Sequence, residues 1–215
     1  MKKFAAILGV CLPMLALSAF AQTQPDFRKA TWGMTQEQVL ASEPGSPVQI
    51  SKSNGEVVVQ FAAPDGSEIR GRLYYIFLDD KLVRAKYISD AEHEDPNDFI
   101  VDFDAVEPHL LEKYGKPAID QAVWENDSYQ QERLPYLDQD RAHASDILPS
   151  DQFTGLSVSL GYLKMFTQRS NARTRIVHAL TGANSRILHQ IEYRSIEFEK
   201  FERAALKNPH DARVF

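Results

Sequence analysis

The chain has 215 residues with 24 lysine and arginine residues against 30 aspartate and glutamate residues, a formal charge of −6. No run of basic residues is dense enough to follow a phosphate backbone, so the composition argues against a nucleic-acid partner. After the first 21 residues no apolar segment of about 18 residues occurs, which argues against an integral membrane span.

Residues 1–21 have the pattern of a cleavable bacterial signal peptide. Lys2 and Lys3 form a positive head, residues 4–17 form an apolar stretch, and residues 19–21 (Ala-Phe-Ala) place small side chains at cleavage spacing. The apolar stretch is shorter than the roughly 20 residues that cross a bilayer. We therefore expect an exported, periplasmic protein that is cleaved after Ala21.

Lipid attachment at Cys11 is the alternative, because Leu8-Gly9-Val10-Cys11 loosely resembles the sequence before a lipoprotein cysteine. Attachment there would leave residues 12–21 as an exposed apolar tail. Cleavage after Ala21 instead removes the only cysteine, which excludes disulfides, thiol nucleophiles and thiolate metal ligands. It also removes Lys2 and Lys3, which leaves 22 basic against 30 acidic residues and a formal charge of −8.

The first predicted helix begins after Thr35. Thr35 is a suitable N-cap, and Gln38 stands three residues later, where a capping box requires it. Residues 44–47 (Pro-Gly-Ser-Pro) end the helix, because proline lacks an amide proton and disfavours helix in the residue before it. A strand is expected next, at Val57–Phe61.

A β-hairpin is predicted from two runs rich in β-branched and aromatic residues, Arg72–Leu78 and Lys81–Ser89, joined at Asp79-Asp80. With a two-residue turn and a regular ladder, Ile76 should lie opposite Val83. Such a hairpin presents one apolar face for a helix to cover.

An amphipathic helix is predicted at Phe99–Tyr114, because apolar residues recur there at spacings of three and four. Gly115 ends it, and Pro108 leaves open a kink or a start nearer Val106. A terminal helix is expected within Ile196–Lys207.

Further strands are predicted at Leu156–Phe166 and in a second hairpin, Arg173–Thr181 with Arg186–Ser195. If its turn is centred between residues 183 and 184, His178 and His189 should lie directly opposite each other.

The two halves of the chain resemble each other. A helix followed by Gly45-Ser46-Pro47 matches a helix followed by Gly115-Lys116-Pro117, Val57–Phe61 corresponds to Ala122–Glu125, and each half then has a hairpin. We therefore predict an α+β fold with two repeats, residues 22–95 and 96–195. Each repeat is a helix followed by a meander of three or four antiparallel strands, with the helices packed on one sheet face. Residues 127–153 form an inserted loop, and residues 196–215 a helix and tail.

A family resemblance adds to this prediction. Gly33-Met-Thr-x-x-x-Val39 followed by Gly45-x-Pro47 resembles the helix-plus-meander unit of the small outer-membrane-assembly lipoproteins and of β-lactamase-inhibitor-like proteins. The helix end at residues 111–117 is similar to a sequence common in exported bacterial proteins. The likeness covers residues 30–90 and, more weakly, 98–195. It implies a protein that presents a sheet surface to another protein. The mature chain departs from the lipoproteins in lacking a cysteine at its start.

Three groups of residues have the composition of a metal site, and none predicts a metal or cofactor. Residues 92–95 (Glu-His-Glu-Asp) with Asp98 suit the positive end of a helix dipole better than a cation. Residues 138–149 begin like a calcium loop (Asp138, Asp140, His143, Asp146), but lack its glycine and have proline in place of its last glutamate. His178 and His189 suit zinc binding or acid sensing, yet with no evident third ligand the preferred interpretation is two partly exposed strand residues.

The loop at residues 127–153 is the predicted partner-binding site, because long loops in compact domains are often functional and tyrosines beside acidic groups suit recognition. The residues expected to contact the partner are Tyr129, Tyr136, Leu137, Asp138 and Asp140.

The sequence predicts a non-enzymatic, periplasmic protein-binding module, an envelope accessory protein or an inhibitor of a secreted enzyme. The alternative is a carrier that holds a small apolar or cationic ligand between the helices and the concave sheet face, with Trp32, Trp124 and tyrosines as walls. A hydrolase that uses carboxylates or a metal at the histidines is the third hypothesis. A serine hydrolase is not expected, because Gly155-Leu-Ser157-Val-Ser159 lacks the second glycine of that motif.

Overall fold

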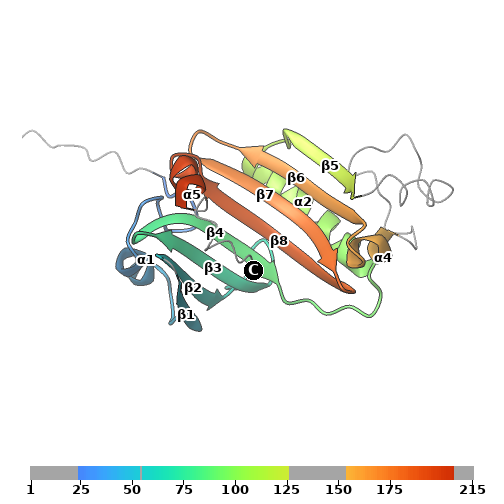
Figure 1. Ribbon diagram of the computed structural model, residues 1–215, viewed down its shortest axis with the longest axis horizontal. Helices are drawn as coiled ribbons and strands as arrows, with labels where there is room; N and C mark the ends of the chain where they lie inside the picture. The colour runs from blue at the N-terminus through green and yellow to red at the C-terminus, as the bar shows by residue number, and fades with distance from the viewer. Residues whose placement is uncertain (1–23, 54, 126–153, 206–215) are drawn as a thin grey trace, which may run out of the picture.

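A computed structural model describes residues 24–53, 55–125 and 154–205 and shows an α+β fold with one antiparallel sheet of eight strands (Figure 1). The strands are β1 (Gln49–Ser53), β2 (Glu56–Ala62), β3 (Gly71–Leu78), β4 (Lys81–Ser89), β5 (Ile119–Trp124), β6 (Leu163–Ser170), β7 (Thr174–Ala183) and β8 (Arg186–Ser195). The helices are α1 (Gln36–Ser42), α2 (Asp98–Tyr114), α4 (Thr154–Ser159) and α5 (Glu199–Ala205). The strand order is β1-β2-β3-β4-β8-β7-β6-β5.

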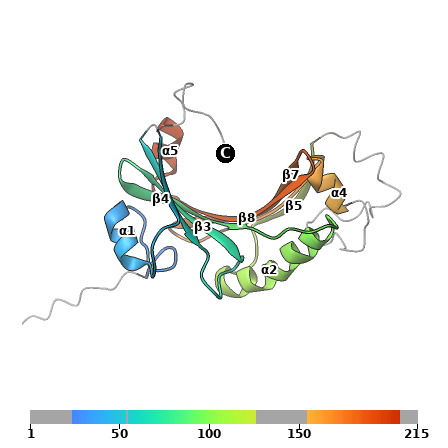
Figure 2. The same cartoon turned by 90° about the horizontal axis from the view of Figure 1, so that it is seen from below.

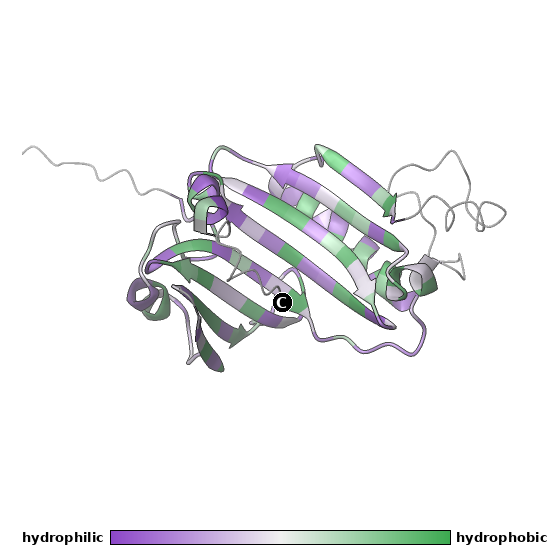
Figure 3. Ribbon diagram, in the orientation of Figure 1, coloured by the Kyte–Doolittle hydropathy of each residue, from purple (hydrophilic) through white to green (hydrophobic). Residues whose placement is uncertain are grey.

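The sheet is curved, with α1 and α2 against its convex face and α5 on its concave face (Figure 2). Polar and apolar residues form alternating bands along the strands (Figure 3), as expected because successive side chains of a strand point to opposite faces. In β6, for example, every second residue from Leu163 to Arg169 is buried on the convex side. None of the helices in the described part of the chain has both the length and the apolar character needed to cross a membrane.

The centre of the convex face is closed by the segment before α1. The Phe27 ring lies 5.6 Å from that of Tyr75 on β3, 5.4 Å from Tyr87 on β4 and 4.7 Å from Tyr193 on β8. Trp32 is buried beside it, and its indole nitrogen donates a hydrogen bond of 2.9 Å to Thr174 Oγ1 on β7. One aromatic cluster therefore ties the start of the chain to strands of both halves.

The local helix signals are confirmed. Thr35 caps α1, and Gln38 completes the capping box. The helix α2 continues through Pro108 without starting again near Val106, and Gly115 follows it with φ of +80°. Leu111, which the periodicity places on the buried face, is 47% exposed.

The first hairpin has the predicted strands and turn, but the predicted register is wrong. Asp79 and Asp80 both have positive φ, as a tight two-residue hairpin turn requires. Phe77 pairs with Leu82, yet Ile76 pairs with Arg84, so Val83 is an extra residue in β4. This β-bulge shifts every later pair by one position.

The second hairpin turns at Asn184-Ser185, one residue later than predicted, and both residues again have positive φ. His178 therefore pairs with Ile191 and His189 with Leu180. The two histidines share a face as diagonal neighbours, and the prediction that they lie directly opposite is wrong.

The predicted strand at Leu156–Phe166 is also wrong in its first half. Residues 154–159 form α4, and β6 begins only at Leu163. The helix lies so close to two other segments that only glycine fits at the contacts. A Cβ on Gly155 of α4 would lie 2.3 Å from the Pro96 carbonyl carbon, and a Cβ on Gly182 of β7 would lie 2.0 Å from the Val158 carbonyl oxygen of α4. Close packing against two other segments thus overrides the alternating sequence pattern.

Strand β1 is absent from the sequence prediction, and its presence changes the expected correspondence between the halves. All five of its residues are exposed, so it carries no alternating signal. It forms one edge of the sheet and β5 forms the other. Residues 122–124 in β5 thus match the position of β1, whereas Val57–Phe61 in β2 match the position of β6.

Candidate functional site

The predicted partner-binding residues lie outside the described part of the chain. Tyr129, Tyr136, Leu137, Asp138 and Asp140 all belong to residues 126–153, as do His143 and Asp146 of the calcium-like sequence.

A buried polar cluster joins α2 to the second half of the sheet. His178 Nδ1 lies 2.6 Å from Glu107 Oε1, and His178 Nε2 lies 2.8 Å from His189 Nε2. Arg169 donates to Glu107 Oε2 at 2.6 Å, and Thr167 donates to Glu107 Oε1 at 2.8 Å. The interpretation of the histidines as partly exposed is wrong, because His178 is fully buried and His189 is 3% exposed.

The charges in this cluster follow from its contacts. Burial alone would raise the pKa of Glu107, but hydrogen bonds from His178, Arg169 and Thr167 lower it to about 2. Burial lowers the pKa of His178 against the opposing effect of Glu107, and burial together with His178 lowers the pKa of His189 to about 3. His178 Nδ1 thus donates to the carboxylate and its Nε2 accepts from His189, which leaves His189 Nδ1 with a buried lone pair.

The geometry of this cluster resembles a proton relay, yet it lies inside the core. The His178 ring stacks on Phe103 of α2 with ring centroids 4.0 Å apart. The alternating pattern of β7 and β8 could have predicted this burial. Every second residue of a strand points to the same face, so His178 shares a face with the apolar Ile176 and Leu180, and His189 shares one with Ile191. We assign the cluster a structural role, in which α2 is fastened to β6, β7 and β8.

The other residues singled out in the sequence do not converge. His93 Nε2 lies 2.7 Å from Asp102 Oδ2. Within the described residues no group of three or more histidine and acidic side chains is placed to hold a metal ion. Trp32 and Trp124 belong to two separate clusters on the convex face and do not form the walls of one cavity.

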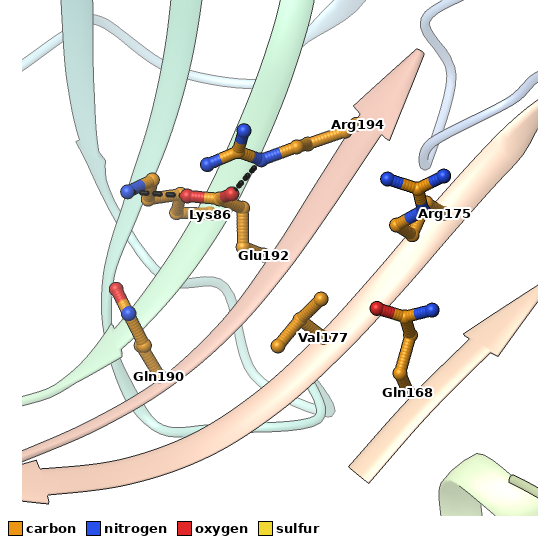
Figure 4. A pocket seen from close by; sticks show the side chains of 7 residues that line it. All are labelled: Lys86, Gln168, Arg175, Val177, Gln190, Glu192 and Arg194. Atoms are coloured by element: carbon orange, nitrogen blue, oxygen red, sulfur yellow. Dashed lines mark hydrogen bonds and ion pairs between the residues drawn. The ribbon is translucent and has the colours of Figure 1, made fainter. Parts of the chain in front are cut away.

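A hollow of about 370 Å³ lies on the opposite, concave face of the sheet (Figure 4). Its lining residues come from β4, β6, β7 and β8: Lys86, Gln168, Arg175, Val177, Gln190, Glu192 and Arg194. Glu192 stands between Lys86 and Arg194 and forms an ion pair with each of them. Burial would raise the pKa of Glu192, but these two cations lower it.

Some of the residues that line the hollow belong to a row of side chains that crosses the whole sheet. The paired residues in this row, from β5 to β1, are Ile119, Gln168, Val177, Glu192, Lys86, Tyr74, Gln60 and Gln49. The row depends on the pairing of β4 with β8, which local sequence patterns do not reveal. The sequence therefore indicated a sheet surface but could not bring these particular residues together on it.

A second row on the same face is basic. Arg175 on β7, Arg194 on β8 and Arg84 on β4 are directly opposite one another. The C-terminal helix α5 supplies counter-charges: Glu199 lies 2.5 Å from Arg175, and Glu202 lies 2.6 Å from Arg84. We refer to Arg175, Arg194 and Arg84 together as the arginine row.

The concave face is thus an open, mainly polar sheet surface on which Lys86 and the three arginines are paired with the carboxylates of Glu56, Glu192, Glu199 and Glu202. Its side chains are held in place by strand pairing and ion pairs and do not include an assembled catalytic group among the residues that the structure describes. Comparisons of the chain with models of protein families, with curated proteins and with solved structures gave no match.

Proposed function

We propose that this chain is a non-enzymatic binding module that receives another protein on the concave face of its sheet. The observation that carries the proposal is the asymmetry of the two faces. The convex face is covered by α1, α2 and the Phe27 segment, whereas among the described helices only the short α5 lies on the concave face (Figure 2). An antiparallel sheet can leave one face to solvent, and that face is then available to a partner.

The size of the concave face suits a protein partner. Eight strands at a spacing of about 4.8 Å give a width of roughly 34 Å between the outermost strands. Strands of 5 to 10 residues add a length of about 17–33 Å, and a stable interface needs about 800 Å² on each partner. The curvature favours a partner with a convex surface.

A duplicated unit accounts for this surface. The order β1-β2-β3-β4 meets the reversed order β8-β7-β6-β5 at the centre, and a helix on the convex face precedes each set of four strands. Both third-to-fourth strand connections are two-residue turns with positive φ. We take residues 22–95 and 96–195 to be two copies of one unit, in line with the sequence resemblance, in which helices and meander together present a sheet surface.

The signal sequence supports a periplasmic location, so the proposed partner is a protein of the cell envelope or a secreted enzyme that the module inhibits. The absence of enzymatic activity is part of the proposal. It is supported by the burial of His178 and His189, which keeps the two imidazoles beside Glu107 away from solvent.

Site-specific cross-linking tests the proposal. A photo-reactive amino acid at Gln190, in the hollow, should cross-link the mature protein to a discrete partner in periplasmic extract or in cells. The same amino acid at Glu112, an exposed position on α2, is the matched control. Cross-linked products of equal amount at both positions, or only at residue 112, would contradict binding on the concave face.

A small-ligand carrier is the second candidate, and the hollow favours it. Lys86, Arg175 and Arg194 line the hollow, so its ligand would be anionic, whereas the sequence suggested an apolar or cationic one. Micromolar binding of a small dicarboxylate by calorimetry, together with no cross-linked protein at Gln190, would favour the carrier over the protein-binding module.

A further inference from the structure

The arginine row places like charges together at an energetic cost. Arg175 faces Arg194 and Arg194 faces Arg84 on adjacent strands, and directly opposed like charges destabilise a sheet. The chain as a whole is acidic, with a formal charge of −6, so the row does not reflect a basic composition. Carboxylates of the sheet already pair with two of the three guanidinium groups, Glu192 with Arg194 and Glu56 with Arg84. Arg175 and the remaining donors of Arg84 are left to bind further carboxylates.

The chain already provides an example of such a ligand. Glu199 and Glu202 are three positions apart on α5, and together they reach Arg175 and Arg84, two strands apart. Side chains at this spacing project from the same face of a helix. An acidic helix is therefore the kind of group that fits across the row.

The helix α5 itself is weakly held. It has only seven residues, and among residues 199–204, whose side chains the structure describes, Glu202 alone is buried. Its apolar anchor is Phe198, which packs on the sheet just before the helix begins. Helices this short are marginal without apolar contacts.

The ion pairs between α5 and the sheet also lack hydrogen-bond geometry. Arg84 Nε, Glu199 Oε1 and Glu202 Oε1 are buried and complete no hydrogen bond within the described structure, although their ionic contacts are close. Buried charged groups without well-aligned partners retain much of their desolvation cost. Another carboxylate with better geometry can therefore replace them.

We propose that the arginine row binds an acidic segment of the partner protein, with carboxylates at helical spacing, and that α5 occupies the row until the partner displaces it. This inference rests on the proposed function and names the chemistry of the partner. The helix α5 is then a built-in competitor, and Phe198 keeps it attached to the sheet.

A binding experiment on the full mature chain tests this. The probe is a fluorescent alanine-based peptide with glutamates three residues apart, and its glutamine counterpart is the negative probe. The double replacement Glu199→Gln with Glu202→Gln removes the competing carboxylates, so the acidic peptide should bind at least tenfold more tightly than to the parent. The charge-matched control is Glu197→Gln with Glu112→Gln, two exposed positions, which should bind like the parent.

A further variant identifies the binding site, and a competing ion identifies the kind of ligand. Adding Arg175→Gln and Arg194→Gln to the double replacement should abolish the gain. Inorganic phosphate should compete only at far higher concentration than the peptide if a polypeptide segment is the ligand, and equal competition would overturn that assignment. Double-replacement protein that binds no more tightly than the control would overturn the proposal.

Hydrogen exchange on the parent protein provides a test that does not depend on a variant folding. Saturating acidic peptide should speed exchange of the α5 amides while the amides of β7 and β8 stay protected. Unchanged exchange in α5 would overturn the inference. The two proposals fail separately, because cross-linking at Gln190 without any effect of the α5 replacements would refute the acidic competitor alone. Peptide binding without a cross-linked partner would refute the protein partner but would leave the competition between α5 and other carboxylates standing.

Discussion

A neutral imidazole buried without an acceptor for a second proton makes protein stability depend on pH. His189 is 3% exposed, and the structure gives its Nδ1 no hydrogen-bond partner among the described residues. Its folded-state pKa is about 3, whereas the unfolded chain titrates near 6.5. Between these values the unfolded state binds more protons than the folded state, so stability falls as the pH falls.

We expect the free energy of unfolding to drop between pH 6.5 and 5 by about 1.4 kcal/mol per pH unit for each imidazole that stays neutral. The replacement His189→Gln keeps a donor for His178 but removes one titration, so its slope should be shallower. Urea denaturation at several pH values measures this. Ser51→Gln, an exposed position without a titrating group in β1, should keep the parental slope. Asp104, whose pKa burial and Glu107 raise to about 6, acts in the opposite direction in every variant.

At the scale of elements, α4 depends on two glycines that let it approach other segments. A Cβ on Gly182 would lie 2.0 Å from the Val158 carbonyl oxygen of α4 and 2.9 Å from the Arg186 oxygen. Both neighbours are backbone atoms, so they cannot turn away as a side chain would.

The replacement Gly182→Ala should therefore destabilise the protein by about 1–3 kcal/mol, as overpacking does. It should also raise hydrogen exchange in α4 before it affects the rest of the sheet. Ala183→Ser at the next, exposed position is the control and should change stability by less than about 0.5 kcal/mol. Equal stability of the two variants in urea would show that α4 can move without cost.

The elements that the sequence predicted correctly are those with signals inside a few residues. The Thr35–Gln38 capping box, the Asp79-Asp80 turn and the apolar face of α2 belong to this class. The Val83 bulge breaks the regular ladder that the alternating pattern assumes, α4 depends on close contacts with distant backbone, and β1 has no buried residue to reveal it. Local patterns therefore predicted the hairpins but not their register.

At the scale of the whole molecule, the two halves share one core. Phe27 packs on Tyr193, and Trp32 donates a hydrogen bond to Thr174, although more than 140 residues separate each pair. The concave site has the same origin, since its rows exist only once β4 pairs with β8. The sequence indicated an exposed sheet surface but could not place residues on it, because this pairing joins segments about 100 residues apart.

Separate chains of residues 24–95 and 96–205 should consequently fail to fold alone, as judged by near-ultraviolet circular dichroism and dispersed amide signals. Mixing them should restore native signals, because β4 and β8 can then pair and Phe27 can reach Tyr193. The intact chain under the same conditions is the control. A stable, cooperative unfolding transition in either half alone would contradict a shared core.

The pairing of β4 with β8 also bears on the time course of folding. After synthesis or export of residues 24–95, β4 has an open edge and Phe27 and Trp32 lack half of their neighbours until residue 195 has emerged. Contacts so distant in sequence are slow to form, because a large loop must close before they gain any energy. Residues 24–95 therefore stay prone to aggregation until β8 can pair with β4, and we expect the full chain to refold slowly.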